Sequence, residues 1–140
     1  MNAPRLVLFS VFMIALLFSC NAQKTDNTES EKIAGSDIEI YYFHFTKRCL
    51  TCNAVESETK LTLQTDYADE VKEGKIVFTS LNLEEEDGKK IAENLQVSGQ
   101  TLLIVKGEEH VNLTNDGFMN ARTNPEKFHS ILKEQLDKLL

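Results

Sequence analysis

The sequence predicts an α/β domain in which a central mixed sheet is flanked by helices, in the order β-α-β-α-β-β-α. Runs rich in β-branched and aromatic residues alternate with segments of helical periodicity. Two of these runs are each followed by a helical segment, which implies parallel neighbouring strands joined by right-handed crossovers. A turn near residue 107 joins the last two runs and adds an antiparallel hairpin. Residues 37–140 are long enough to form one domain around a single core.

The first strand is predicted over residues 38–45, IEIYYFHF. Apolar or aromatic side chains occupy both of its faces, so we expect it to be buried on both sides of the sheet. A helix then begins at or near Cys49 and ends at Gly74, the residue type that commonly follows the last turn of a helix. A helical stripe recurs at every fourth position, at Val55, Thr59, Leu63, Tyr67 and Val71.

The second strand is predicted over residues 75–83, and the acidic run 84–87 follows it. We interpret this run as the start of a helix, where the dipole favours acidic residues, rather than as a metal site. The third strand covers residues 101–105, residues 107–109 form a turn, and alternation over residues 111–113 indicates the fourth strand. The short helix between the second and third strands buries Ile91, Ala92 and Leu95.

The C-terminal part begins with a predicted loop at residues 115–117, after which Phe118 returns to the core. The last helix begins at Asn124 and Pro125, with the asparagine as its cap and the proline at its first position. Its packed face is formed by Phe128, Ile131, Leu132, Gln135, Leu136 and Leu139.

The N-terminus is typical of an export signal. Arg5 supplies a basic region, and the 13 residues 6–18 are apolar except for Ser10. Such a run is shorter than the roughly 20 residues of a membrane-spanning helix and suits a secretory signal. It ends in LFSC, residues 17–20, which resembles a bacterial lipobox. That resemblance implies removal of residues 1–19 and lipidation of Cys20 as a membrane anchor. An ordinary cleaved signal with a chance cysteine, and an uncleaved anchor, remain as alternatives.

The predicted mature chain is acidic and holds one pair of free cysteines. Loss of Arg5 with the signal lowers the formal net charge from −7 to −8, which argues against nucleic acid as a partner. Residues 20–36 are the lipidated cysteine and a polar, flexible tether with a reach of about 20–25 Å. Of the three cysteines, the two that are not lipidated would lie in an exported compartment where disulfides persist.

Cys49-Leu50-Thr51-Cys52 lies where the first strand meets the first helix. Two cysteines at this spacing can close a disulfide, and the free N–H groups and dipole of a helix start stabilise a thiolate. We expect Cys49 to be exposed and to react with a partner, and Cys52, one turn further, to resolve the mixed disulfide. Lys47 and Arg48 either lower the pKa of Cys49 further or are solvated loop cations.

The strand, the CxxC motif, the helix and residues 97–105 (VSGQTLLIV) together resemble the thioredoxin superfamily. The resemblance covers essentially all of residues 37–140. It implies a thioredoxin-like fold with a redox-active disulfide between Cys49 and Cys52. The last of these segments corresponds to the stretch in which that family has a cis-proline followed by Thr-Leu-Leu.

Two positions depart from the family pattern. Gln100 stands where the family has its cis-proline, and a cis peptide bond before a non-proline residue costs about 2.5–4 kcal/mol, so we expect a trans bond and an altered substrate groove. Phe43 stands where thioredoxins have a buried acid, six positions before the first cysteine. His44 is then the nearest titratable candidate to exchange a proton with Cys52; its alternative role is that of a packed, hydrogen-bonded strand residue.

A narrower resemblance is given by the strings YYFHFTKRCLTCNAVE, VSGQTLLIV and NPEKF. They are similar to small exported proteins of Bacteroidetes-type bacteria that are known as a nitrophenyl-compound nitroreductase subunit encoded in arsenic-resistance clusters. This resemblance implies a redox accessory role. The sequence has no flavin-binding signature, and no cofactor is expected.

Three functions remain open from the sequence. The first is a membrane-tethered thiol–disulfide oxidoreductase or electron relay for a periplasmic or membrane protein partner. The second is a binding module in which Cys49 and Cys52 capture a soft ion such as arsenite, copper(I) or zinc. The third is a domain whose disulfide is only structural. The histidines, His44, His110 and His129, have no clear ligand spacing to the CxxC motif.

Overall fold

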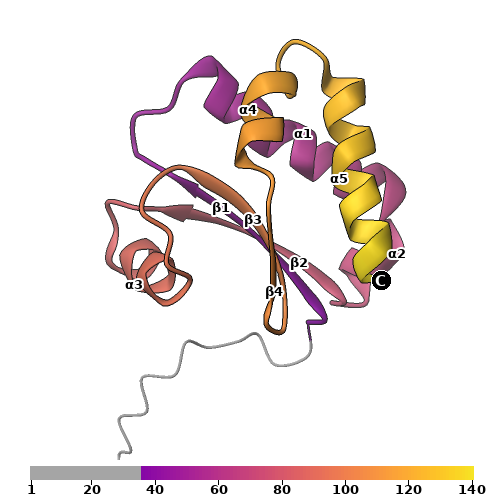
Figure 1. The fold of residues 1–140 in the computed structure, drawn as a ribbon, viewed down its shortest axis with the longest axis horizontal. Coiled ribbons are helices and arrows are strands. Elements are labelled where there is room, and N and C mark those ends of the chain that lie inside the picture. Colours follow the sequence, from indigo (N-terminus) through magenta and orange to yellow (C-terminus); the bar gives the residue numbers. More distant parts are fainter. Residues whose placement is uncertain (1–35) are drawn as a thin grey trace, which may run out of the picture.

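Four strands form a mixed sheet at the centre of the computed structural model, which describes residues 36–140 (Figure 1). The strands are β1 (Ile38–His44), β2 (Ile76–Asn82), β3 (Thr101–Lys106) and β4 (Glu109–Asn112), in the spatial order β2-β1-β3-β4. The predicted α/β class, with its mixed sheet, is confirmed. The predicted signal peptide, Cys20 and all of the tether except Ser36 lie outside the described residues.

The pairing of the strands corrects one part of the predicted topology. β1 is parallel to β2 and antiparallel to β3, and β3 pairs with β4 in the predicted antiparallel hairpin. A second parallel crossover was expected between β2 and β3, and that prediction is wrong. The connecting helix α3 (Glu86–Asn94) spans only about 14 Å, less than the roughly 23 Å length of β2. β2 ends opposite His44 and β3 begins opposite Phe43, so the chain leaves β2 and enters β3 at the same end of β1.

Helices cover the two faces of the sheet unequally (Figure 1). α1 (Leu50–Asp66), α4 (Thr114–Asn120) and α5 (Pro125–Leu139) lie on one face, and α3 lies on the other. The main core lies under the three-helix face and includes Ile38, Ile40, Tyr42, Val55, Leu63, Ile76, Leu102, Ile104, Phe128, Leu132 and Leu136. None of the helices in residues 36–140 has the length and apolar character needed to span a bilayer.

The predicted helix over residues 49–74 is divided into α1 and α2 (Ala68–Lys72). The break is at Tyr67, which has φ −132° and is 4% exposed. Its hydroxyl donates a hydrogen bond of 2.6 Å to Asp137 on α5. This anchor to a distant helix explains why the backbone leaves the helical path although the sequence pattern continues. Gly74 follows the end of α2, as predicted.

The predicted loop at residues 115–117 is instead part of α4. Gly117 is buried against α1, and an added Cβ would lie 3.2 Å from Val55 Cγ1. The glycine therefore permits two helices to approach closely, and it does not mark a turn. Phe118 packs partly buried against the core, as predicted. With α2 and α4 the observed order is β-α-α-β-α-β-β-α-α.

The first strand is buried on both faces, as predicted. Tyr42 belongs to the core under the three-helix face, while Tyr41 and Phe43 stack with ring centroids 5.9 Å apart on the other face. Glu39 on that same face is 9% exposed and accepts hydrogen bonds from Tyr41 (3.0 Å) and Ser36 (3.2 Å). Burial, together with the Glu39 carboxylate, raises the pKa of Tyr41 to about 12.

Candidate functional site

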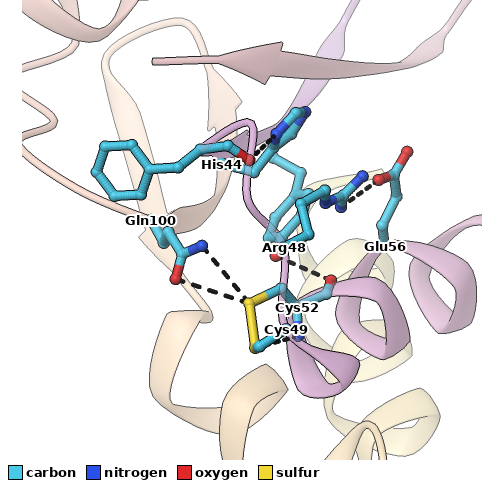
Figure 2. Close-up of a disulfide and its surroundings, with 8 residues drawn as sticks. His44, Arg48, Cys49, Cys52, Glu56 and Gln100 are labelled. Carbon is cyan, nitrogen blue, oxygen red and sulfur yellow. Dashed lines mark hydrogen bonds and ion pairs between the residues drawn. A yellow bond between two sulfur atoms is a disulfide. The ribbon is translucent and has the colours of Figure 1, made fainter. Parts of the chain in front are cut away.

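The predicted cysteine pair forms a disulfide at the point where β1 passes into α1 (Figure 2). Cys49 is the N-cap of α1, with φ −85° and ψ 167°, and its Sγ accepts a hydrogen bond from the Cys52 N–H at 3.0 Å. The two Cα atoms are 5.0 Å apart. The sulfur of Cys49 thus takes the place of the side-chain oxygen that usually caps a helix, and it lies at the positive end of the helix dipole.

The two cysteines differ in exposure. Cys49 is exposed, and Leu50 beside it is 72% exposed. Cys52 is 3% exposed and belongs to the buried face of α1. Because only one of the two residues is open to solvent, a large reactant reaches the disulfide from the side of Cys49. The predicted difference in exposure between the two cysteines is confirmed.

Tyr42 on β1 holds the first turn of α1 through a hydrogen bond. Its side chain is fully buried, and its hydroxyl donates a hydrogen bond of 2.9 Å to the Cys52 carbonyl oxygen. Burial raises the pKa of Tyr42, and the nearby Arg48 guanidinium opposes that rise. The sequence does not reveal this contact. Its one signal there is an aromatic residue with a hydroxyl on β1, near the strand end that leads to the cysteines.

The positive charge of Arg48 is directed at α1 and away from the sulfur atoms. Its guanidinium stacks over the Tyr42 ring, 5.4 Å from the centroid, and forms an ion pair with Glu56 (Figure 2). Glu56 also receives Lys60 at 2.5 Å, the i,i+4 pair that the sequence predicted. Burial alone would raise the pKa of Glu56, but the hydrogen bonds from Lys60 and Arg48 outweigh it and hold that pKa low. Lys47 is exposed.

Gln100 is brought to the buried sulfur from 48 residues along the chain. It precedes β3, and its side-chain amide contacts Cys52 Sγ, with Nε2 at 3.5 Å and Oε1 at 3.8 Å (Figure 2). The position that departs from the thioredoxin pattern is therefore in direct contact with the disulfide. Its amide is a polar group at a place where proline would present only carbon atoms.

His44, the other candidate modulator, is engaged elsewhere. Its Nδ1 lies 3.0 Å from the Phe45 carbonyl oxygen, which makes Nδ1 the protonated nitrogen in this contact. Its ring lies 5.9 Å from that of Tyr42, in a tilted arrangement. Within residues 36–140, no hydrogen bond joins His44 to Cys49 or Cys52.

Two clefts of the domain lie away from the disulfide. One cleft lies between α1 and α5, and its lining includes Asp66, His129 and Lys133. A second lies near α3, and its lining includes Glu39, Tyr41 and His110. Neither of these two clefts is lined by a cysteine. Among residues 36–140, no group of three or more His, Cys, Asp or Glu side chains comes together as a metal site. The disulfide is a surface site, reached at the end of α1.

Comparison with known proteins adds little. No family model matches the chain, and no curated protein matches it. The chain is similar to a solved structure described as "Structure of a malarial protein", with 16% sequence identity and a TM-score of 0.42, over 56% of this chain and 81% of that chain. A similarity of this size supports no conclusion about fold or function.

Proposed function

We propose that this chain is a thiol–disulfide oxidoreductase of thioredoxin-like fold, or an electron-relay accessory, that exchanges electrons with a protein partner through Cys49 and Cys52. The observation that carries the proposal is a disulfide at the N-terminus of a helix, with one cysteine exposed and the other buried. A purely structural disulfide needs no such asymmetry. The mixed sheet with helices on both faces supports the thioredoxin-like fold.

In the proposed reaction, a thiolate of the partner attacks Cys49 Sγ. The bond between the two cysteines breaks, and its electron pair leaves on Cys52 Sγ, which takes up a proton. The second thiol of the partner then loses its proton and attacks the partner sulfur of the mixed disulfide, releasing Cys49 as a thiolate that is protonated in turn. The partner dithiol is oxidised to a disulfide, and the chain gains two electrons and two protons. A partner that brings a disulfide runs the same steps in reverse.

The proposed location is the periplasm or the cell surface, where the chain is anchored to a bacterial membrane by the lipid on Cys20. The support for it is in the sequence alone: the apolar run at residues 6–18, the lipobox-like LFSC and the polar segment before the domain. An exported compartment also favours a persistent disulfide. The partner is accordingly a periplasmic or membrane protein.

The proposal is tested by redox titration. The full chain, purified in detergent, is equilibrated with mixtures of reduced and oxidised dithiothreitol, and the free thiols of Cys49 and Cys52 are counted by alkylation. We expect a reversible two-electron transition above about −300 mV. A much lower potential would identify a structural disulfide. Stoichiometric binding of arsenite by the reduced chain, lost in Cys49→Ser, without a reversible transition would support the binding module instead.

A further inference from the structure

The buried sulfur of the pair has one polar side chain against it. Cys52 is 3% exposed, and within residues 36–140 the only side-chain hydrogen-bonding group on its Sγ is the amide of Gln100. The Tyr42 hydroxyl donates to the carbonyl oxygen of Cys52 and not to its sulfur. The residue at the position of the buried acid of thioredoxins, Phe43, has no polar atom in its side chain.

The chemistry of the disulfide decides which atom of the amide donates. A disulfide sulfur carries no hydrogen, so the Oε1 atom of Gln100, itself only an acceptor, has nothing to accept from it. The amide NH₂ group is a donor, and Nε2 is the nearer of the two atoms, at 3.5 Å against 3.8 Å for Oε1. In the oxidised protein the bond therefore runs from Gln100 Nε2–H to Cys52 Sγ.

The same sulfur is the atom on which charge develops during exchange. When an external thiolate attacks the exposed Cys49, Cys52 leaves as a thiolate in a buried site, and burial disfavours a charged sulfur. In the reverse direction Cys52 must again become a thiolate before it attacks Cys49. A donor aimed at this sulfur stabilises the charge in both directions, because the two directions share one transition state.

The charged and titratable groups around the disulfide do not perform this task. The Arg48 guanidinium is paired with Glu56 and stacked on Tyr42, and Glu56 is also held by Lys60. His44 uses its Nδ1 on a backbone carbonyl. Among the described residues, the neutral amide of Gln100 is the side-chain donor in contact with the sulfur.

We propose that Gln100 is a catalytic hydrogen-bond donor to Cys52 Sγ, which stabilises the thiolate that forms there whenever the disulfide opens or closes. This role rests on the proposed thiol–disulfide exchange. It assigns a chemical purpose to the residue that replaces proline at this position. The amide also serves the protonated state, because rotation about its last bond presents Oε1 to a Cys52 S–H group.

The test compares Gln100→Leu and Gln100→Glu with the unaltered full chain in detergent. The leucine has a similar size and no donor, and the glutamate keeps the shape of glutamine but offers only acceptors when ionised. The matched control is Gln64→Leu, the same chemical change at an exposed position of α1. Two quantities are measured: the pKa of Cys52 in the reduced chain, from the ¹³Cβ shift of labelled cysteine, and the rate at which dithiothreitol opens the disulfide.

We expect Gln100→Leu to raise the pKa of Cys52 by about one unit and to slow the opening of the disulfide about three- to tenfold. Changes of this size correspond to the loss of one hydrogen bond to a charged group. Gln100→Glu should raise the pKa further, because its carboxylate repels the thiolate. Gln64→Leu should change neither quantity. An unchanged or lower Cys52 pKa in the variants, or an unchanged rate, overturns the role of Gln100.

The two proposals fail in different ways. If the unaltered chain cannot be reduced and reoxidised reversibly, the proposed function itself is wrong. If the unaltered chain cycles normally and the Gln100 variants behave like Gln64→Leu, only the role of Gln100 is wrong. Circular dichroism establishes that each variant is folded. Should Gln100→Leu not fold, Gln100→Glu has the same shape as the native side chain and decides the question alone.

Discussion

Replacement of Tyr42 by phenylalanine removes one hydroxyl group from beneath the cysteines and leaves the ring in place. The lost contact is the hydrogen bond of 2.9 Å to the Cys52 carbonyl oxygen. In a regular α-helix that carbonyl also accepts the N–H of Glu56, so it keeps one partner in Tyr42→Phe. The expected loss in the free energy of unfolding is therefore about 1 kcal/mol, the net contribution of one hydrogen bond. For a domain of about 100 residues this lowers Tm by roughly 4 °C.

The assay is urea denaturation of the oxidised and the reduced chain, with the midpoint read at constant m-value. The carbonyl oxygen that loses its partner belongs to the backbone and carries no redox chemistry. We therefore expect the same loss in both redox states, and Arg48 should remain stacked on the phenylalanine ring. No loss of stability, or a loss confined to one redox state, would refute this account of how Tyr42 supports the helix start.

Three further predictions concern accessibility, pH and packing. In the reduced native chain, iodoacetamide should modify Cys49 at least about tenfold faster than Cys52, because only Cys49 is exposed; equal rates by mass spectrometry would contradict the difference in exposure. Glu56 has a lowered pKa, so its ion pairs add stability at pH values above its usual pKa, and this stability is lost as pH falls through its folded-state pKa. Glu56→Gln should lower the free energy of unfolding by about 1 kcal/mol at neutral pH. Urea titrations over a falling pH series should show this difference shrinking, and a difference that does not change with pH would argue against it. Gly88→Ala places a Cβ 2.0 Å from the Asn82 carbonyl oxygen. It should lower the free energy of unfolding by about 1–3 kcal/mol despite the better helix propensity of alanine. A more stable variant would show that α3 can shift away from β2 without loss.

Local signals in the sequence were sufficient where the structure is set by neighbouring residues. Asn124 caps α5 by accepting the N–H of Lys127 at 3.3 Å, and Pro125 is the first helical residue, as the sequence predicted. The apolar and aromatic residues on both faces of β1 likewise predicted a strand buried on both sides. The position of Cys49 at the start of α1 followed from the change of periodicity there.

Contacts between distant parts of the chain were not predictable in the same way. The sequence showed Glu56 as the partner of Lys60, but the pairing with Arg48 requires the loop before α1 to fold back over the helix. Tyr67 continues a helical stripe, and its anchor on Asp137 nevertheless ends α1. Gln100 was conspicuous only as a departure from a family pattern; its contact with Cys52 depends on the approach of β3 to β1.

Ser36, the first described residue, donates a hydrogen bond to the buried Glu39 near the start of β1. The domain is entered at the first residues of β1, and the disulfide lies just beyond the other end of that strand. β1 has seven residues and a length of about 23 Å. The first described residues and the disulfide are therefore separated by the full length of β1, which crosses the sheet (Figure 1). A group that contacts the domain at one end of this strand leaves the other end uncovered.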